Sequence, residues 1–239
     1  MKIVTTDLLG VAMDNFQQRG IHLPIEADLV LSLGKACRPA QALRRNHLRT
    51  FASPFDWMMN YSLKTISNFF NNGFSTFFKE YTIIDKKNKY IVKDVKSGML
   101  SLHDFPTDKN VADVYPEFIR KMNKRFTQTV TNINTSRNIL FISNRDIAEY
   151  PCFIEFINDM HDIMYKKNIY ILNIHNSKEE EININYINKS TLFFDIRFHD
   201  CHQNGDGPDN PDRWMGNIEK WDWVMKFIKP TYEITGKYN

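Results

Sequence analysis

Short apolar runs alternate with longer segments of helical periodicity along this chain. A compact apolar run is typical of a buried strand, and apolar residues three and four positions apart are typical of the buried side of a helix. Strands that alternate with helices favour right-handed crossovers and a mainly parallel mixed sheet with helices on both faces. The pattern predicts an α/β fold with strands at residues 29–33, 81–84, 90–95, 99–102, 138–143, 169–174, 182–187 and 192–196, and helices at residues 37–48, 56–70, 111–130, 153–165 and 214–228.

One domain accounts for all 239 residues. Residues 204–212 are rich in Gly, Pro, Asp and Asn, and we interpret them as a loop within the domain because a Trp-rich helix follows. Residues 81–84 and 90–95 flank a run of Lys and Asn, which predicts an exposed hairpin. The sequence contains no internal repeat and no low-complexity linker, so the expected domain spans residues 1–239.

Composition and charge exclude several classes of protein. Apolar residues make up 42% of the chain and charged residues 25%, which is ordinary for a globular protein. The formal net charge is +3, and no dense Lys/Arg stripe with interleaved aromatic residues occurs, which argues against a nucleic acid as partner. The oligomeric state stays open at this point.

Segment lengths and cysteines bear on the cellular compartment. No segment approaches the ~20 apolar residues that cross a bilayer, and residues 1–16 lack the apolar stretch of a secretory signal. Three widely spaced cysteines without a CxxC pair argue against a disulfide framework and suit a reducing compartment. We therefore expect a cytoplasmic protein.

Several predicted strands end in residues that can carry chemistry. Ligands of open α/β sheets bind outside the carboxyl ends of the strands. If all of these strands are parallel, their ends converge on one edge of the sheet and form a single site. The residues concerned are Lys35 to Cys37, His103 with Asp104, Asn144 with Arg145, His175, and His199 with Asp200.

Cys37 is the leading candidate for a nucleophile. It follows a strand and a Gly-containing turn, at the start of a helix whose next residue is Arg38. A helix N-terminus and a nearby cation both favour the thiolate, so we expect the pKa of Cys37 to lie below the ordinary value of about 8.5. This arrangement exposes the attacking atom beside backbone N–H groups that can hold an oxyanion. The alternative is a buried structural cysteine.

His103 is the candidate base for Cys37, since histidine titrates near neutral pH. Asp104 or Asp56 would orient its imidazole ring. The alternative role for His103 is a hydrogen bond to a backbone carbonyl at the end of a strand. For Asp56 the alternative is an N-cap of the helix predicted at residues 56–70.

Basic residues near these positions are candidates for substrate binding. Arg44, Arg45 and Arg49 would form one basic face that grips a phosphate or a carboxylate, although such a run is more often simply solvated. The candidate binding residues are Lys35, Arg38, Arg44, Arg49 and Arg145.

No motif indicates a metal or a nucleotide cofactor. The run from His199 to His202 lacks the usual zinc spacing, and the acidic loop at residues 204–212 does not match an EF-hand loop. Gly34 and Lys35 lack the other glycine and the Ser/Thr of a Walker motif. We expect no cofactor and no metal site.

Several short blocks of the sequence are distinctive in combination. They are Ser32-Leu33-Gly34, Cys37, Pro39-Ala40, Leu43-Arg44-Arg45, Leu48-Arg49, Ser53-Pro54-Phe55-Asp56-Trp57, Asn72-Gly73-Phe74, His103-Asp104-Phe105 and Arg125-Phe126. Together they resemble a bacterial domain family of unknown function that is described as papain-like cysteine peptidases. The resemblance covers residues 27–230, and its first block is fairly specific.

This resemblance implies Cys37 as the nucleophile and His103 as its partner. Genes of the family often lie among surface-polysaccharide clusters, which implies a glycan or a sugar precursor as substrate and transfer chemistry rather than proteolysis. A papain-like α+β fold is the alternative to the pattern-based α/β fold. In many relatives the strand after Arg125 ends in Arg, and here Arg145 would take that place.

The leading hypothesis is a thiol-dependent acyl transferase or hydrolase that acts on a small molecule or a glycan. The first alternative is a glycosyl or phosphosugar transferase with a structural Cys37, in which Arg145 and the basic helix face bind a nucleotide sugar. The second is a non-catalytic glycan- or partner-binding module, in which Trp214, Trp221 and Trp223 stack on the ligand.

Overall fold

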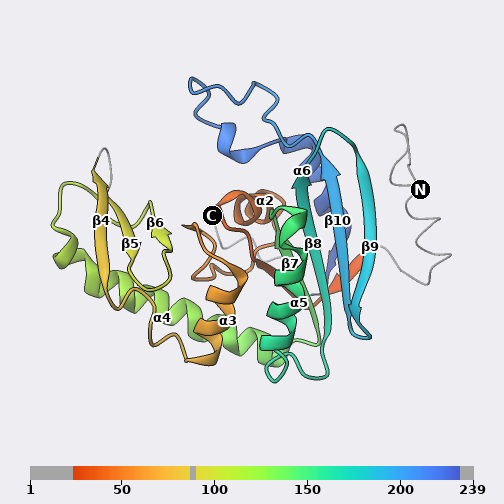
Figure 1. Ribbon diagram of the computed structural model, residues 1–239, viewed down its shortest axis with the longest axis horizontal. Coiled ribbons are helices and arrows are strands. Elements are labelled where there is room, and N and C mark those ends of the chain that lie inside the picture. The colour runs from red at the N-terminus through yellow and green to blue at the C-terminus, as the bar shows by residue number, and fades with distance from the viewer. Residues whose placement is uncertain (1–23, 87–89, 232–239) are drawn as a thin grey trace.

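A five-stranded sheet forms the centre of the structure, a computed structural model that describes residues 24–86 and 90–231 (Figure 1). Its strand order is β2 (Leu29–Ser32), β7 (Asn138–Ser143), β8 (Asn168–Asn176), β10 (Thr191–Phe198) and β9 (Glu181–Asn188). The first four strands are parallel, and β9 is antiparallel at the edge. The predicted mainly parallel mixed sheet is therefore confirmed. Residues 1–16, considered above for a secretory signal, lie outside the described residues.

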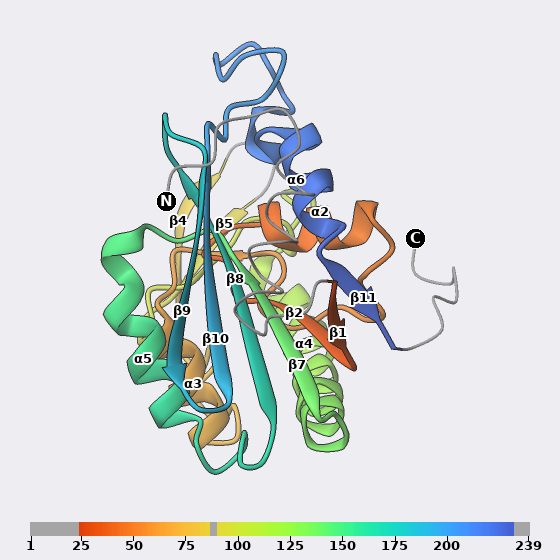
Figure 2. The same ribbon diagram turned by 90° about the vertical axis from the view of Figure 1, so that its right-hand side faces the viewer.

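Helices cover both faces of this sheet, because successive side chains of a strand point to opposite faces. Phe141 of β7 packs into one apolar core, and its neighbour Leu140 packs into a second core on the other face. Strands buried on both sides read as continuous apolar runs, which is why the sequence reveals them. The helices of the first core are α3 (Leu63–Asn71), α4 (Val111–Thr135) and α5 (Tyr150–Asp159), and those of the second are α2 (Arg38–Arg45) and α6 (Ile218–Met225) (Figure 2).

A second, antiparallel sheet lies beside the central one (Figure 1). Its strand order is β3 (Met58–Met59), β6 (Leu100–Ser101), β5 (Tyr90–Asp94) and β4 (Tyr81–Lys86). The pairing of β4 with β5 confirms the predicted hairpin. The expectation that the strand before His103 joins the parallel sheet is wrong, since β6 pairs with β3 and β5. A separate parallel pair joins β1 (Ile25–Ala27) to β11 (Ile228–Pro230).

The helix predicted at residues 56–70 is wrong over its first half. The short strand β3 interrupts it, and Asn60 takes a left-handed backbone with φ of 57° before α3 begins. The N-cap of α3 is Ser62, whose hydroxyl accepts a hydrogen bond from a backbone N–H of the first turn at 3.0 Å. Asp56 therefore lies in a turn and is not the N-cap of this helix.

The other predicted helices keep their places but differ at their ends. α2 stops before His47, whose left-handed backbone (φ 58°) turns the chain, so Arg49 lies beyond the helix. α6 starts after Gly216, also left-handed at φ 67°, and this leaves Trp214 in a separate 3₁₀ turn. In the part of the chain that the structure describes, no helix is long and apolar enough to span a membrane.

Candidate active site

The loop between β2 and α2 places Cys37 at the carboxyl end of the parallel sheet. Cys37 directly precedes α2 and is buried, with 7% of its surface exposed. Gly34 is required in this loop, because a Cβ there would lie 2.5 Å from Cγ of Pro39 and 2.7 Å from Oδ1 of Asn144. The close approach of the loop to the helix start therefore defines where the thiol lies.

His103 meets Cys37 from the antiparallel sheet. Nε2 of His103 lies 3.7 Å from Sγ of Cys37, although 66 positions separate the two residues in the sequence. The indole of Trp57 meets the imidazole edge-on, with ring centroids 6.3 Å apart and an interplanar angle of 87°. The structure thus brings the predicted nucleophile and base together from two different sheets.

Burial, followed by the negative charge of Asp56, raises the pKa of the Cys37 thiol to about 11. The expected pKa below the ordinary value is therefore wrong. Arg38 does not offset the burial, because its guanidinium is directed to the Asp200 carboxylate at 2.5 Å. Burial therefore favours the neutral thiol of Cys37 beside His103 at neutral pH.

We expect the alkylation of Cys37 by iodoacetamide to become about tenfold faster per pH unit between pH 8 and pH 10, because the thiolate is the reactive form. The variant His103→Gln is used, so that an imidazole base does not assist. Mass spectrometry of the Cys37 peptide gives the rate, and the exposed Cys152 serves as internal control. A rate that levels off below pH 8 would contradict the raised pKa.

The two candidate carboxylates are held by neighbouring residues. Asp56 is buried and accepts hydrogen bonds from the Ser53 hydroxyl at 2.7 Å and from Nη1 of Arg49 at 3.2 Å. Burial raises the pKa of Asp56, and the hydrogen bonds from Ser53 and the charge of Arg49 oppose this rise. Asp104 accepts a hydrogen bond from Nζ of Lys121 at 2.5 Å. Asp56 acts on Cys37 through its charge.

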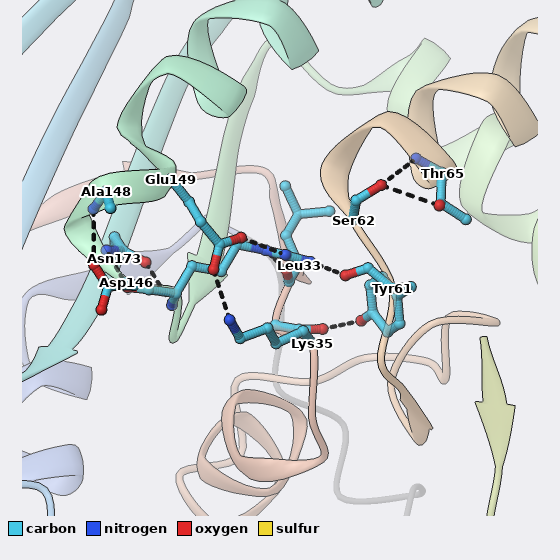
Figure 3. Close-up of polar contacts among 11 residues, drawn as sticks. Leu33, Lys35, Tyr61, Ser62, Thr65, Asp146, Ala148, Glu149 and Asn173 are labelled. Atoms are coloured by element: carbon cyan, nitrogen blue, oxygen red, sulfur yellow. Dashed lines mark hydrogen bonds and ion pairs between the residues drawn. The ribbon is translucent and has the colours of Figure 1, made fainter. Parts of the chain in front are cut away.

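Arg145 and Tyr61 hold the loop that precedes Cys37 (Figure 3). Nε of Arg145 donates a hydrogen bond to the Leu33 carbonyl at 3.2 Å. The Tyr61 hydroxyl donates to the next carbonyl along the chain, that of Gly34. These two hydrogen bonds fix the orientation of two successive peptide groups of the loop.

The other nitrogens of Arg145 also make contacts, and Figure 3 labels the two residues concerned, Tyr61 and Glu149. Nη2 donates to the Tyr61 carbonyl at 2.9 Å, and Nη1 pairs with the Glu149 carboxylate at 2.9 Å. Lys35, another candidate binding residue, donates from Nζ to the same carboxylate at 2.6 Å. The side chain of Arg145 is only 1% exposed. The side chain of Arg145 is thus buried against the loop that precedes Cys37 and stabilises its backbone through hydrogen bonds.

The remaining candidate binding residues do not share one face. Arg38 donates to the Trp214 carbonyl at 2.8 Å and pairs with Asp200. Arg44 is exposed on α2, whereas Arg49 lies beyond the end of α2 and pairs with Asp56. The predicted basic face of Arg44, Arg45 and Arg49 is therefore wrong, because Arg45 pairs with Asp222 and Arg49 pairs with Asp56.

Three residues of this region were not predicted as site residues. Tyr61 and Trp57 fall within the helix predicted at residues 56–70, where aromatic residues indicate core packing alone. Glu149 follows Arg145 by four positions, a spacing that pairs opposite charges on a helix. That spacing was one usable signal, although it concerned support of the loop, and Trp57 also stands in one of the blocks that carry the family resemblance.

A second cysteine and histidine lie close together in the loop after β10. Nε2 of His199 is 3.1 Å from Sγ of Cys201. A hydrogen bond with Asp206, together with burial, raises the pKa of the Cys201 thiol. Within residues 24–86 and 90–231, no group of three or more His, Cys, Asp or Glu side chains could hold a metal ion.

Comparison with known proteins gives one family and one relative. The model of the family described as "Putative papain-like cysteine peptidase" matches residues 28–177, a range that includes both Cys37 and His103. An uncharacterized protein of Acanthamoeba polyphaga mimivirus is 24% identical over 209 residues, covering 76% of this chain and 93% of that protein. No solved structure gives a significant match.

Proposed function

This chain belongs to the family of that description, and on this premise we propose that Cys37 and His103 carry out thiol-dependent acyl transfer, as a hydrolase or an acyl transferase. The observation that carries the proposal is the 3.7 Å contact between Sγ of Cys37 and Nε2 of His103. A nucleophile and a base within reach of each other, brought from separate elements, are the minimum requirement for such chemistry.

The proposed reaction has two steps. Sγ of Cys37 attacks an acyl carbonyl while its proton moves to Nε2 of His103, and the imidazolium then protonates the leaving group as a thioester forms. Water or an acceptor hydroxyl next attacks the thioester and gives its proton to His103, which regenerates the free thiol. Water as the second nucleophile gives hydrolysis, and a hydroxyl gives transfer.

Backbone N–H groups of the Cys37 loop are the proposed oxyanion site. In a trans peptide the N–H points away from the carbonyl of the preceding residue. Arg145 and Tyr61 hold the carbonyls of Leu33 and Gly34. The N–H groups of the same two peptides, which belong to Gly34 and Lys35, therefore point the opposite way. No acceptor in the described part of the chain is bonded to them. They are therefore available to a substrate oxyanion.

The alternative functions find less support. A phosphosugar transferase needs Arg145 to face its ligand, yet the guanidinium is buried and bonded to two carbonyls and Glu149. A stacking module needs exposed tryptophans, and of the three candidates only Trp214 is exposed, at 40%, whereas Trp221 is fully buried and donates to Asp200 at 2.9 Å. A glycan or sugar precursor as acyl acceptor, implied by the family resemblance, stays a prediction.

Incubation with p-nitrophenyl acetate is expected to add one acetyl group to Cys37, detected by mass spectrometry of the native protein. The activated ester supplies the acyl group and releases p-nitrophenolate. The variant Cys37→Ala is the negative control, and the exposed Cys152 reports the background reaction of an ordinary thiol. Acetylation of Cys152 alone, with Cys37 reactive only after unfolding, would show a structural cysteine and refute the proposal.

A further inference from the structure

Two ion pairs lie near the Cys37–His103 pair, and each joins a carboxylate to one cation. Arg49 pairs with Asp56 at 3.2 Å, and Lys121 of α4 pairs with Asp104 at 2.5 Å. Each of these carboxylates is thus matched by one cation. A further cation in the same region has no partner of this kind.

That cation is Arg125, one helical turn after Lys121 on α4 and half-buried. Among the described residues its guanidinium donates one hydrogen bond, to the sulfur of Met122 at 4.0 Å, and makes no ion pair with a carboxylate. Lys121, four positions earlier on the same face of α4, pairs with Asp104, which directly follows His103 in the sequence. Arg125 therefore lies on the helix face that is directed toward the active pair.

Arg49 contributes a second unused donor. Its Nε is buried and has no hydrogen-bond partner among the described residues, although Nη1 of the same side chain holds Asp56. Its guanidinium carbon lies 5.7 Å from the ring centroid of Trp57, the residue that packs edge-on against His103. A buried donor without a partner costs free energy, and a ligand that accepts from it removes that cost.

We propose that Arg125, together with Nε of Arg49, binds an anionic group of the acyl substrate beside the Cys37–His103 pair. The proposal rests on the proposed acyl-transfer function and names its substrate class, an acyl compound that carries a carboxylate or a phosphate. Guanidinium groups suit both anions because their N–H donors match the spacing of two anionic oxygens. Arg125 acts here as a specificity-determining residue.

The test compares two alkylating reagents at Cys37, the anionic iodoacetate and the neutral iodoacetamide. Because both reagents react with the same thiolate, its intrinsic reactivity cancels in the ratio of the two rates. The ratio therefore reports the electrostatic potential at the thiol. We expect Arg125→Gln to lower the ratio about tenfold, as loss of one partly screened charge predicts. Arg125→Lys, which keeps the charge, is expected to retain most of the preference.

The matched control is Arg120→Gln, which removes a charge from an exposed position on the same helix, where the side chain is 76% exposed. Its ratio is expected to equal that of the wild type. An unchanged ratio in Arg125→Gln would overturn the proposal. Acetate and inorganic phosphate, added as competitors, identify the preferred anion by which of them slows the iodoacetate reaction at the lower concentration.

If Cys37 of the native protein reacts with neither reagent, the proposed acyl-transfer function is refuted. The anion site is then tested separately by the shift of Tm that an anion causes. Inorganic phosphate at saturation is then expected to raise the Tm of the wild type and of Arg120→Gln by about 2–4 °C, corresponding to a modest binding free energy. Loss of this shift in Arg125→Gln supports the anion site. A shift that persists in Arg125→Gln, or that is absent from the wild type, overturns it.

Discussion

Replacement of His103 by alanine is expected to slow the acetylation of Cys37 at pH 7 by about two to four orders of magnitude, the usual contribution of a general base. The thiol has a pKa of about 11, so very little thiolate exists at neutral pH without a proton acceptor. His103 is the group whose Nε2 lies 3.7 Å from the sulfur. Release of p-nitrophenolate from p-nitrophenyl acetate, corrected for the rate of Cys37→Ala, measures the effect.

The pH profile separates this role from a structural one. In His103→Ala the rate is expected to recover as pH approaches 11, because hydroxide then supplies the thiolate that His103 otherwise makes possible. A variant whose loop is merely distorted would stay slow at every pH. The exposed His161 provides a matched control, and His161→Ala is expected to react like the wild type. Equal rates in His103→Ala and wild type at pH 7 would remove the histidine from the mechanism.

Local patterns predicted the parts of the site that are built locally. The apolar run at residues 29–33, the glycine after it and the helix that follows place Cys37 at a strand end, and the structure confirms each of these elements. β7 and β8 were equally readable, since strands covered on both faces are apolar throughout. Periodicity is a property of neighbouring residues, so it carries this information directly.

Contacts between distant segments could not be predicted in the same way. His103 was expected at the edge of the parallel sheet, yet it follows β6 of the antiparallel sheet and still reaches Cys37. The pKa of Cys37 was expected to fall because a helix N-terminus and Arg38 are its neighbours in sequence. Burial and the carboxylate of Asp56 decide it instead, and both depend on how the chain folds.

The direction of the Arg145 side chain also depends on contacts between distant segments and could not be predicted from the sequence. A basic residue after a strand that ends at the site edge suggests a ligand contact, and the sequence contains nothing to say that the side chain turns inward. The carbonyls of Leu33 and Tyr61, which accept its hydrogen bonds, come from segments more than 80 positions away. Its burial and its three bonded nitrogens predict a larger effect on stability than an exposed charge has.

We expect Arg145→Met to lower the free energy of unfolding by about 3–5 kcal/mol, because the buried Arg145 bonds two buried carbonyls and one partly exposed carboxylate. The substitution leaves the buried carbonyls of Leu33 and Tyr61 without their donors, each worth about 1–3 kcal/mol, and leaves Glu149 paired with Lys35 alone. Urea unfolding followed by circular dichroism measures the change.

Two further variants show whether the effect comes from the bonds of Arg145 or from its charge. Arg145→Lys keeps the charge but cannot reach both carbonyls and the carboxylate, so an intermediate loss of stability is expected. Arg120→Met, which removes the exposed partner of Glu117, is expected to cost less than about 1 kcal/mol. If Arg145→Met unfolds at the same urea concentration as Arg120→Met, these hydrogen bonds do not hold the Cys37 loop. A large loss in Arg145→Met alone would show that the hydrogen bonds of Arg145 stabilise the loop that precedes Cys37.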